Sequence, residues 1–179
     1  MNILAAHRYP TPRNGPLSRE ESEIRRLAYA VKSIAADSVD FDTVARAMAS
    51  LITGPCWLVP IPDSAGNTDA NTRLATMIAR YVASAAGSPG AQVAKAIRRT
   101  QPIESQCQRH KKALGPIPPD QHHLARTGKM LGLRQTYFVD NVTTSGNTMQ
   151  AARDALGFGA GLVFADAANH KTQFQANLL

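Results

Sequence analysis

The sequence predicts an α/β fold in which helices flank a mostly parallel sheet. Short apolar segments alternate with segments of helical periodicity through most of the chain. In addition, the apolar segment Tyr137–Asp140 leads through a bend of small polar residues straight into an amphipathic segment. This order of strand, helix and strand is typical of βαβ units, in which helices cover both faces of a parallel sheet.

The composition fits one compact globular unit. A chain of 179 residues is long enough to bury a core, and 44% hydrophobic against 18% charged residues argues against disorder. No apolar run reaches about 18 residues, so no membrane partner is expected. The first residues lack the pattern of a secretory signal, and two cysteines do not make a disulfide framework. A cytoplasmic location is therefore expected.

Residues 1–55 are expected to form an N-terminal helical segment packed on the core. Prolines and a glycine predict that residues 1–16 are irregular. Ser18 and Glu21 then match the capping-box pattern that begins a helix. Apolar residues at helical spacing follow as far as Ala35, so the first helix is expected to extend to about that point.

The middle of the chain predicts two more helices and a strand. Asp40 is expected to cap a second helix whose apolar face extends to Ile52. The apolar run Cys56–Ile61 predicts a buried strand, and residues 62–67 have the composition of a turn. Apolar residues at helical spacing over 74–85 predict the third helix.

The remaining segments complete the alternation. Residues 91–97 predict a weak strand, and the proline- and glycine-rich segment 98–134 is expected to be mostly irregular. A helix over 148–156 and a last strand over 161–165 follow. Residues 56–179 are thus expected to form the main α/β domain.

Loops at one edge of the sheet are the expected place for a ligand. The carboxyl ends of parallel strands meet at the same edge, and ligands bind beyond them. The sequence therefore brings three loops together at one rim, namely residues 62–67, 98–127 and 141–147.

The bend after Asp140 has the composition of an anion site. Thr143, Thr144 and Ser145 offer hydroxyl and backbone N–H groups at the mouth of a helix, where the helix dipole is positive. Gly146 permits the positive φ that a backbone wrapped around a phosphate often needs. The alternative is an ordinary strand, turn and helix in which Asp140 only caps the helix.

The stretch YFVDNVTTSGNT resembles the phosphoribosyl-pyrophosphate (PRPP) motif of the type I phosphoribosyltransferases. The resemblance implies that the bend holds the 5′-phosphate of PRPP and that the two residues at the strand end hold the ribose hydroxyls. One departure is plain, because the family's second acidic residue is an amide here, Asn141. The matched residues are Asp140, Asn141, Val142, Thr143, Thr144, Ser145, Gly146, Asn147 and Thr148.

Two further segments extend the resemblance toward the competence-associated ComF-type branch of this superfamily. They are the run VPIP near the end of the first predicted strand and the stretch from Ala94 to Lys112. The resemblance covers residues 56–166 and implies a small irregular hood over the site. It implies pyrophosphate binding by the backbone amides of Asp63 and Ser64 and by the side chains of Arg98 and Arg99, although the first two residues also suit a simple helix-entry turn.

The resemblance also implies a reaction. PRPP would be bound with Mg²⁺, held by Asp140 through water, and its phosphoribosyl group would pass to the nitrogen of a small-molecule base with release of pyrophosphate. Asp140, Arg109 and Lys111 are the expected catalytic residues, the basic pair because negative charge grows on the leaving group. The family resemblance suggests a homodimer. The alternatives are a protein that senses PRPP or a nucleotide without catalysis, and a ComF-like DNA-handling protein.

The chain is basic, with a formal charge of +7 and a pI near 9.9. Much of the excess lies in residues 95–134. This segment could meet a polyphosphate substrate, bind the backbone of a nucleic acid weakly, or form a plain solvated surface. It lacks interleaved aromatic residues that would stack bases, which weakens the single-strand interpretation.

Overall fold

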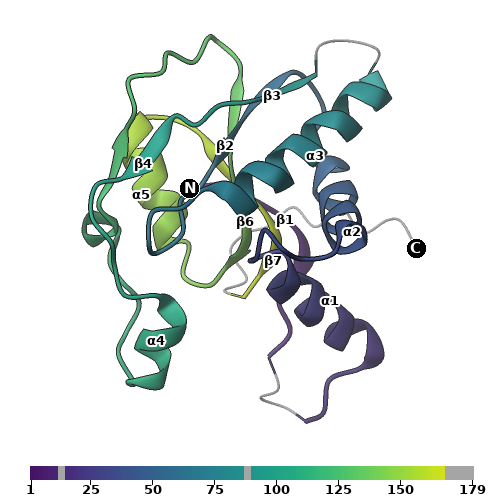
Figure 1. The fold of residues 1–179 in the computed structure, drawn as a ribbon, viewed down its shortest axis with the longest axis vertical. Helices are drawn as coiled ribbons and strands as arrows, with labels where there is room; N and C mark the ends of the chain where they lie inside the picture. Colours follow the sequence, from purple (N-terminus) through teal and green to yellow (C-terminus); the bar gives the residue numbers. More distant parts are fainter. Residues whose placement is uncertain (12–14, 87–89, 168–179) are drawn as a thin grey trace.

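A five-stranded sheet in which all neighbouring strands are parallel forms the centre of the molecule (Figure 1). The computed structural model describes residues 1–11, 15–86 and 90–167, without side chains for residues 84–86, 106 and 107. The predicted α/β class is confirmed. The strand order is β1 (Ile3–Arg8), β7 (Ala160–Asp166), β6 (Gln135–Thr143), β2 (Cys56–Pro60) and β3 (Ala91–Val93).

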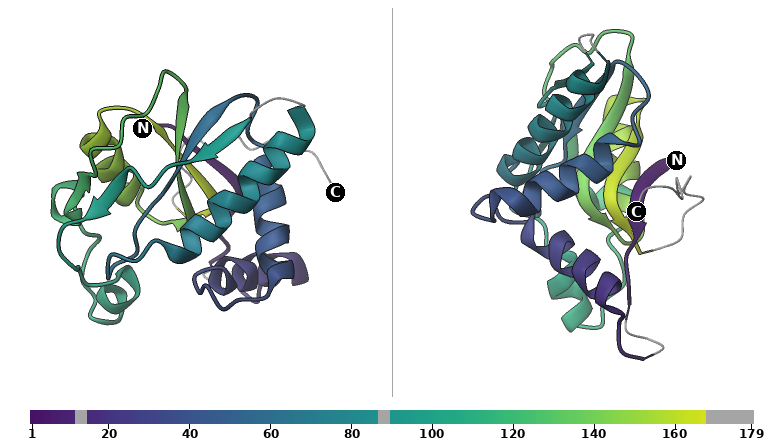
Figure 2. Two further views of the ribbon diagram at one scale, coloured as in Figure 1. Left: turned by 45° about the horizontal axis from the view of Figure 1, so that its top comes forward. Right: turned by 90° about the vertical axis from the view of Figure 1, so that its right-hand side faces the viewer.

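Helices cover both faces of this sheet (Figures 1 and 2). The central strands alternate between the two layers, since Tyr137 and Val139 of β6 pack on one side and Phe138 on the other. Each side therefore has its own buried apolar layer. One face carries α1 (Arg19–Ala30), α2 (Ser38–Ala49) and α3 (Asp69–Ala86), and the other carries α5 (Asn147–Leu156).

The expectation that residues 1–16 are irregular is wrong for the first strand. Residues Ile3–Arg8 form β1, which pairs in parallel with β7 at the edge of the sheet. Ile3 and Ala5 are buried in the layer that contains α5, while Leu4 packs toward the other layer. The partner strand lies more than 150 residues away in the chain, so no local pattern could reveal the pairing.

The first helix begins as predicted but ends earlier. Ser18 caps α1 in a full capping box with Glu21. The helix ends at Ala30 rather than near Ala35, and the side chain of Ile34 is 51% exposed. Residues 31–37 instead form a turn between α1 and α2, which becomes important for the site.

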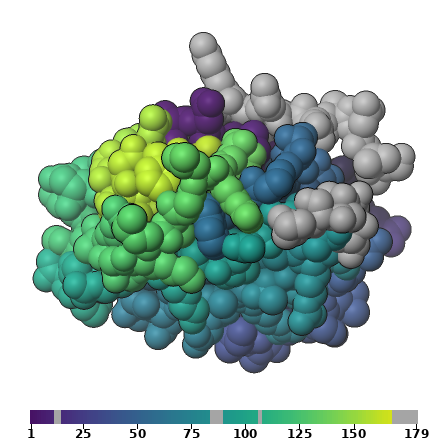
Figure 3. Space-filling view, turned by 90° about the horizontal axis from the view of Figure 1, so that it is seen from above, coloured from purple at the N-terminus to yellow at the C-terminus, as the bar shows by residue number. Residues whose placement is uncertain are grey.

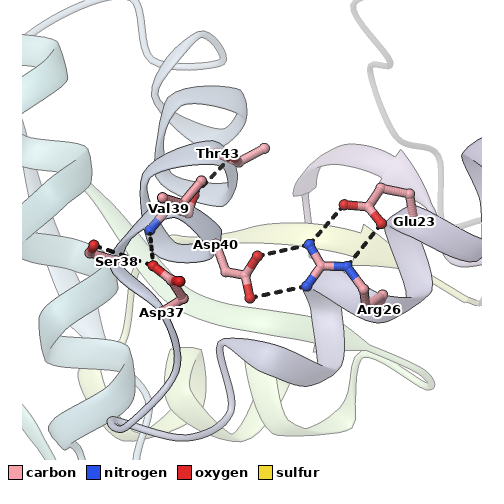
Figure 4. Close-up of polar contacts among 7 residues, drawn as sticks. All are labelled: Glu23, Arg26, Asp37, Ser38, Val39, Asp40 and Thr43. Atoms are coloured by element: carbon pink, nitrogen blue, oxygen red, sulfur yellow. Dashed lines mark hydrogen bonds and ion pairs between the residues drawn. The ribbon is translucent and has the colours of Figure 1, made fainter.

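Asp40 does not cap the second helix, as had been expected. Asp37 does so, because its carboxylate accepts the backbone N–H of Val39 at 2.9 Å. Asp40 instead receives two hydrogen bonds from the guanidinium of Arg26, which also binds Glu23 (Figure 4). Arg26 lowers the pKa of Asp40, and this two-pronged contact ties α1 to α2 at the surface.

The segment expected to be mostly irregular contains defined elements. The predicted strand over 91–97 is split between β3 and β4 (Ile97–Arg99), and β4 pairs with β5 (Leu124–Arg126) in a separate antiparallel ribbon. Between them lie α4 (Gln106–Lys111) and a 3₁₀ helix, η2 (Pro119–His122). These short elements lack the periodicity by which longer ones are predicted.

The segment between β5 and β6 projects from the end of the molecule at the top of Figure 1, and Figure 3 views that end (green). It exposes the large apolar side chains of Met130 and Leu133. Because it leads into the start of β6, it lies at the amino end of the sheet, away from the carboxyl edge that parallel strands offer to ligands. None of the helices in the described part of the chain is long and apolar enough to cross a membrane.

Candidate functional site

A cavity of about 650 Å³ lies at the carboxyl edge of β2 and β6. All three loops that were expected at one rim contribute to it. The turn after α1 forms an additional wall that sequence reasoning missed. The lining residues are Lys32, Ile34, Pro62, Asp63, Ser64, Asn67, Asp69, Ala70, Asn71, Arg99, Ile103, Glu104, Ser105, Ile117, His122, residues 140–146 and Thr148.

The bend between β6 and α5 is open toward this cavity. Gly146 occupies the N-cap position of α5 with φ at +75°, a conformation that favours glycine, and no side chain caps the helix. Within the described part of the chain, the backbone N–H groups of Thr144 and Gly146 have no acceptor. Amides of this kind at a helix N-terminus are suited to bind an anion.

Asp140 lies beside the bend, half-buried at the end of β6. Its Oδ1 atom accepts the backbone N–H of Asn141 at 2.8 Å and the side-chain amide of Asn71 at 3.3 Å. Burial raises the pKa of Asp140, and these bonds together with the charges of Lys32 and Arg99 offset only part of the rise. The positive charges near Asp140 are therefore too weak to cancel the effect of burial on its pKa.

Asn71 holds Asp140 against α3. Its Nδ2 atom also donates to the carbonyl of Ile61 at 2.8 Å, so one side chain bridges the ends of β2 and β6. We expect Asn71→Ala to raise the pKa of Asp140 further and to lower the free energy of unfolding by about 1 kcal/mol. Carboxyl titration by NMR and urea denaturation measure both. Asn67→Ala, which changes another asparagine of the cavity wall, should do neither.

The amide of Asn141 has a structural partner. Asn141 is buried, and its Nδ2 atom donates to the backbone carbonyl of Ala28 at 2.6 Å. That carbonyl belongs to the last turn of α1, where helix carbonyls lack partners within the helix. An aspartate would place a negative charge against this carbonyl and the negative end of the helix dipole. The structure thus gives a physical reason for an amide at the position where the PRPP motif has its second acid.

The turn after β2 is organised by Asp63. The carboxylate of Asp63 accepts the backbone N–H groups of Ala65 and Asn67, both at 2.9 Å. The backbone N–H of Asp63, predicted to meet pyrophosphate, donates to the carbonyl of Asn67 at 2.8 Å. Ser64 lines the cavity, and its carbonyl accepts from Ile103. Of the predicted pyrophosphate amides, that of Asp63 is therefore already occupied.

The two predicted pyrophosphate arginines are in different environments. Arg99 lines the cavity and donates to the carbonyls of Asp63 (2.7 Å), Pro62 (3.2 Å) and His122. Burial lowers the pKa of its guanidinium. Arg98 is exposed and does not line the cavity. Arg99 therefore joins the turn after β2 to η2, and Arg98 faces solvent.

The two cations predicted to be catalytic, Arg109 and Lys111, lie on α4, outside the cavity lining. The Nε atom of Arg109 donates to the carbonyl of Gly115 at 2.9 Å, and its guanidinium pairs with Glu104 at 3.9 Å. Lys112 pairs with the same glutamate at 2.5 Å. Lys111 is exposed. Of these residues, Glu104 lines the cavity, whereas Arg109, Lys111 and Lys112 do not.

One side chain fastens the loop 115–123 to the bend, and a second contacts the same carbonyl from within the loop. Asn147, the one motif residue outside the cavity lining, donates its side-chain amide to the carbonyl of Ile117 at 2.8 Å. The Nε2 atom of His122 lies 3.3 Å from the same carbonyl. Burial lowers the pKa of His122, and the neighbouring Arg99 lowers it further. The Asn147 amide therefore joins the bend to the loop, and His122 stabilises the loop itself.

The lining of the cavity carries more carboxylates than cations. The carboxylates are those of Asp63, Asp69, Glu104 and Asp140, and the cations are Lys32 and Arg99. Of the four carboxylates, Glu104 is paired with Arg109 and Lys112, which lie outside the lining. No group of three or more His, Cys, Asp or Glu side chains suited to a metal ion is found in the described ranges. A metal here would therefore need oxygen atoms from a ligand or from water in addition to Asp140, which is how Mg²⁺ is commonly held.

Sequence reasoning missed several lining residues, of which Lys32 and Asn71 matter most for the site. Lys32 falls within the stretch that was expected to be helical, because the helical spacing continues past the residue at which α1 ends. Asn71 follows a turn and carries no motif. A possible signal was its place in the first turn of a helix that follows a parallel strand, where side chains face the ligand edge.

In comparisons with known proteins, no family model, no curated sequence and no solved structure matched this chain. The resemblance to the type I phosphoribosyltransferases therefore rests on the motif residues themselves.

Proposed function

We propose that this protein binds PRPP together with Mg²⁺ and transfers the phosphoribosyl group to a nitrogen nucleophile, a nucleobase-like molecule, with release of pyrophosphate. The observation that carries the proposal is the bend at residues 143–148, which opens into the same cavity as Asp140. In this proposal the bend binds the 5′-phosphate, and Asp140 lies beside the ribose. Because this chemistry belongs to nucleotide metabolism, a cytoplasmic location goes with it.

Several features of the site support binding of a sugar phosphate. Backbone N–H groups of the bend would bind a phosphate in fixed geometry. Those of Thr144 and Gly146 have no acceptor in the described part of the chain. Asp140 can accept hydrogen bonds from two neighbouring ribose hydroxyls. The hydroxyl groups of Thr144 and Thr148 add donors at the same wall.

The negative walls of the cavity explain why a divalent cation belongs to the proposal. A polyphosphate entering beside the carboxylates of Asp63, Asp69 and Asp140 would meet repulsion unless a cation accompanied it. Bound Mg²⁺ would neutralise charge on the pyrophosphate leaving group. Asp140, with its shortage of positive neighbours, is the residue that would hold the ion through water. The protein's own part is to fix the ribose and the 5′-phosphate.

Binding is tested by thermal unfolding of the protein with PRPP and Mg²⁺. Ten-fold saturation should stabilise the fold by ~1.4 kcal/mol, and PRPP without metal should stabilise it less. Release of pyrophosphate across a panel of nucleobases and small amines then tests the transfer. The absence of any shift at millimolar PRPP with Mg²⁺ would reject the proposal.

One observation favours a second candidate, a PRPP sensor without catalysis. Arg98, Arg109 and Lys111 lie outside the cavity lining, so few cations face the place where negative charge would develop. Binding of PRPP without pyrophosphate release from any base would support the sensor. The basic surface of α4 keeps a third candidate, DNA handling, open to a simple test. DNA binding with a steep salt dependence would support it.

A further inference from the structure

The cavity is built from both faces of the sheet. The bend and α5 come from one face, and α3 and the turn at residues 31–37 come from the other. Strand ends separate the two walls. The turn contributes Lys32 and Ile34, both of which belong to the N-terminal segment rather than to the motif. A ligand that is bound at the bend and reaches across the strand ends would meet a wall that lies outside the motif.

This second wall is fixed in place by two independent sets of contacts. Asn141 binds the carbonyl of Ala28 at 2.6 Å, which joins the end of α1 to the motif strand. Arg73 of α3 donates to the carbonyls of Ile34 (2.7 Å) and Ala36 (3.0 Å). The guanidinium of Arg73 also lies 4.1 Å from the ring centroid of Phe41. The turn is thus held by its backbone, and its outward side chains remain available.

Lys32 is the cation of the cavity that is available to a ligand. Arg99 already donates to three carbonyls. The side chain of Lys32 is exposed, and its ammonium lies 4.9 Å from the ring centroid of Tyr29. This ammonium makes no hydrogen bond or ion pair with a described residue, although the backbone N–H of Lys32 donates to the carbonyl of Tyr29. The positive charge of Lys32 lowers the pKa of Asp140, but burial has the larger effect and the pKa remains raised. A long flexible ammonium at the wall opposite an anion-binding bend suits a second anionic group.

We propose that Lys32 binds the second anionic group of a ligand whose first anionic group occupies the bend, and that Asn141 is a positioning residue that holds the Lys32 wall. This proposal rests on the proposed function in one respect. If the bend takes the 5′-phosphate of PRPP, then Lys32 meets the pyrophosphate at the other end. The site is thereby specific for sugar phosphates that carry anionic groups at both ends.

The test compares PRPP with ribose 5-phosphate, which lacks the second anionic group, by calorimetry in the presence of Mg²⁺. Lys32→Ala should weaken PRPP binding by about ten-fold, the effect of one charge-assisted hydrogen bond, and change ribose 5-phosphate binding by less than about two-fold. Lys32→Arg should retain most of the affinity. Lys129→Ala removes a lysine outside the cavity lining and should change neither.

Asn141→Asp tests whether residue 141 positions the wall that carries Lys32 or contacts the ribose, as the second acid of the PRPP motif would. Restoring the acid would strengthen PRPP binding if residue 141 contacted the ribose, whereas our proposal predicts weaker PRPP binding and unchanged ribose 5-phosphate binding, because the wall that carries Lys32 is displaced. Circular dichroism establishes that the variant is folded, and Lys32→Ala tests the same wall if it is not.

The possible outcomes are distinct. Equal loss for both ligands in Lys32→Ala, or no loss for either, overturns the assignment of Lys32 while PRPP binding by the wild type still supports the proposed function. Failure of the wild type to bind PRPP and ribose 5-phosphate overturns both proposals. A selective loss for PRPP supports both.

Discussion

Replacement of Asp140 by asparagine should weaken binding of PRPP with Mg²⁺ by at least about 100-fold. The carboxylate can accept two charge-assisted hydrogen bonds from ribose hydroxyls or metal-bound water, and each contributes about 1.5–3 kcal/mol. An amide keeps the shape and the bonds from Asn71 and Asn141 but removes the charge. Isothermal titration calorimetry measures the loss, and far-UV circular dichroism checks the fold.

The same substitution should stabilise the protein at pH 7. Burial raises the pKa of Asp140, so the folded state holds this proton more tightly than the unfolded state does. Stability therefore falls as pH rises from the unfolded pKa, near 3.8, through the raised folded pKa, and it stays lower above that point. Asp140→Asn removes this penalty, so its melting temperature should exceed that of the wild type at pH 7 and match it in acid.

The pair of effects makes the prediction specific to a functional carboxylate. Binding should be lost while stability is gained, a trade-off expected when a charge is kept for ligand binding. By the same titration, wild-type affinity should decline on acidification through the raised pKa. If Asp140→Asn bound PRPP as the wild type does, Asp140 would have no part in the site.

Replacement of Arg99 by alanine should lower the free energy of unfolding by about 3 kcal/mol. Its guanidinium donates to three backbone carbonyls that belong to the turn after β2 and to η2. Loss of this charged donor leaves the carbonyls of Pro62 and His122 without a partner among the described residues, whereas the carbonyl of Asp63 keeps the backbone N–H of Gly66. Each unsatisfied carbonyl in a partly buried region costs about 1–3 kcal/mol. Urea denaturation measures the change.

Arg98 provides the matched control on the same strand. It neighbours Arg99 in β4 but faces solvent, so Arg98→Ala should change the free energy of unfolding by less than about 0.5 kcal/mol. Similar effects of the two substitutions would mean that the carbonyl contacts of Arg99 contribute little. Weaker PRPP binding by Arg99→Ala is also expected, because the turn at residues 62–67 loses its support.

The motif region could be anticipated from sequence because its signals are local. An apolar strand, a hydroxyl-rich bend, a glycine and an amphipathic helix follow one another, and β6, the bend with Gly146 at positive φ, and α5 appear in that order. The capping box at Ser18 was predictable for the same reason. The confluence of three loops at one rim also followed, since parallel strands share a carboxyl edge.

Residues whose role depends on distant partners could not be anticipated. In the sequence, Asn141 appeared only as an amide in place of the motif's second acid. In the structure, its amide binds the carbonyl of Ala28, a residue 113 positions away in the chain. Arg109 and Lys111 looked like ligands because they are basic, yet they lie on a helix outside the cavity lining. Basic composition gives the net charge of a segment but not the direction in which each side chain points.

The sequence by itself determined the α/β class, the order of most elements and the bend beyond Asp140, because hydrophobic periodicity, capping and glycine conformation act over a few neighbouring residues. Only the tertiary structure decided that the first residues form an edge strand, that α1 ends early and that Lys32 lines the cavity. These features depend on contacts between segments far apart in the chain. Their free energy comes from burial and from hydrogen bonds that form only when the sheet assembles.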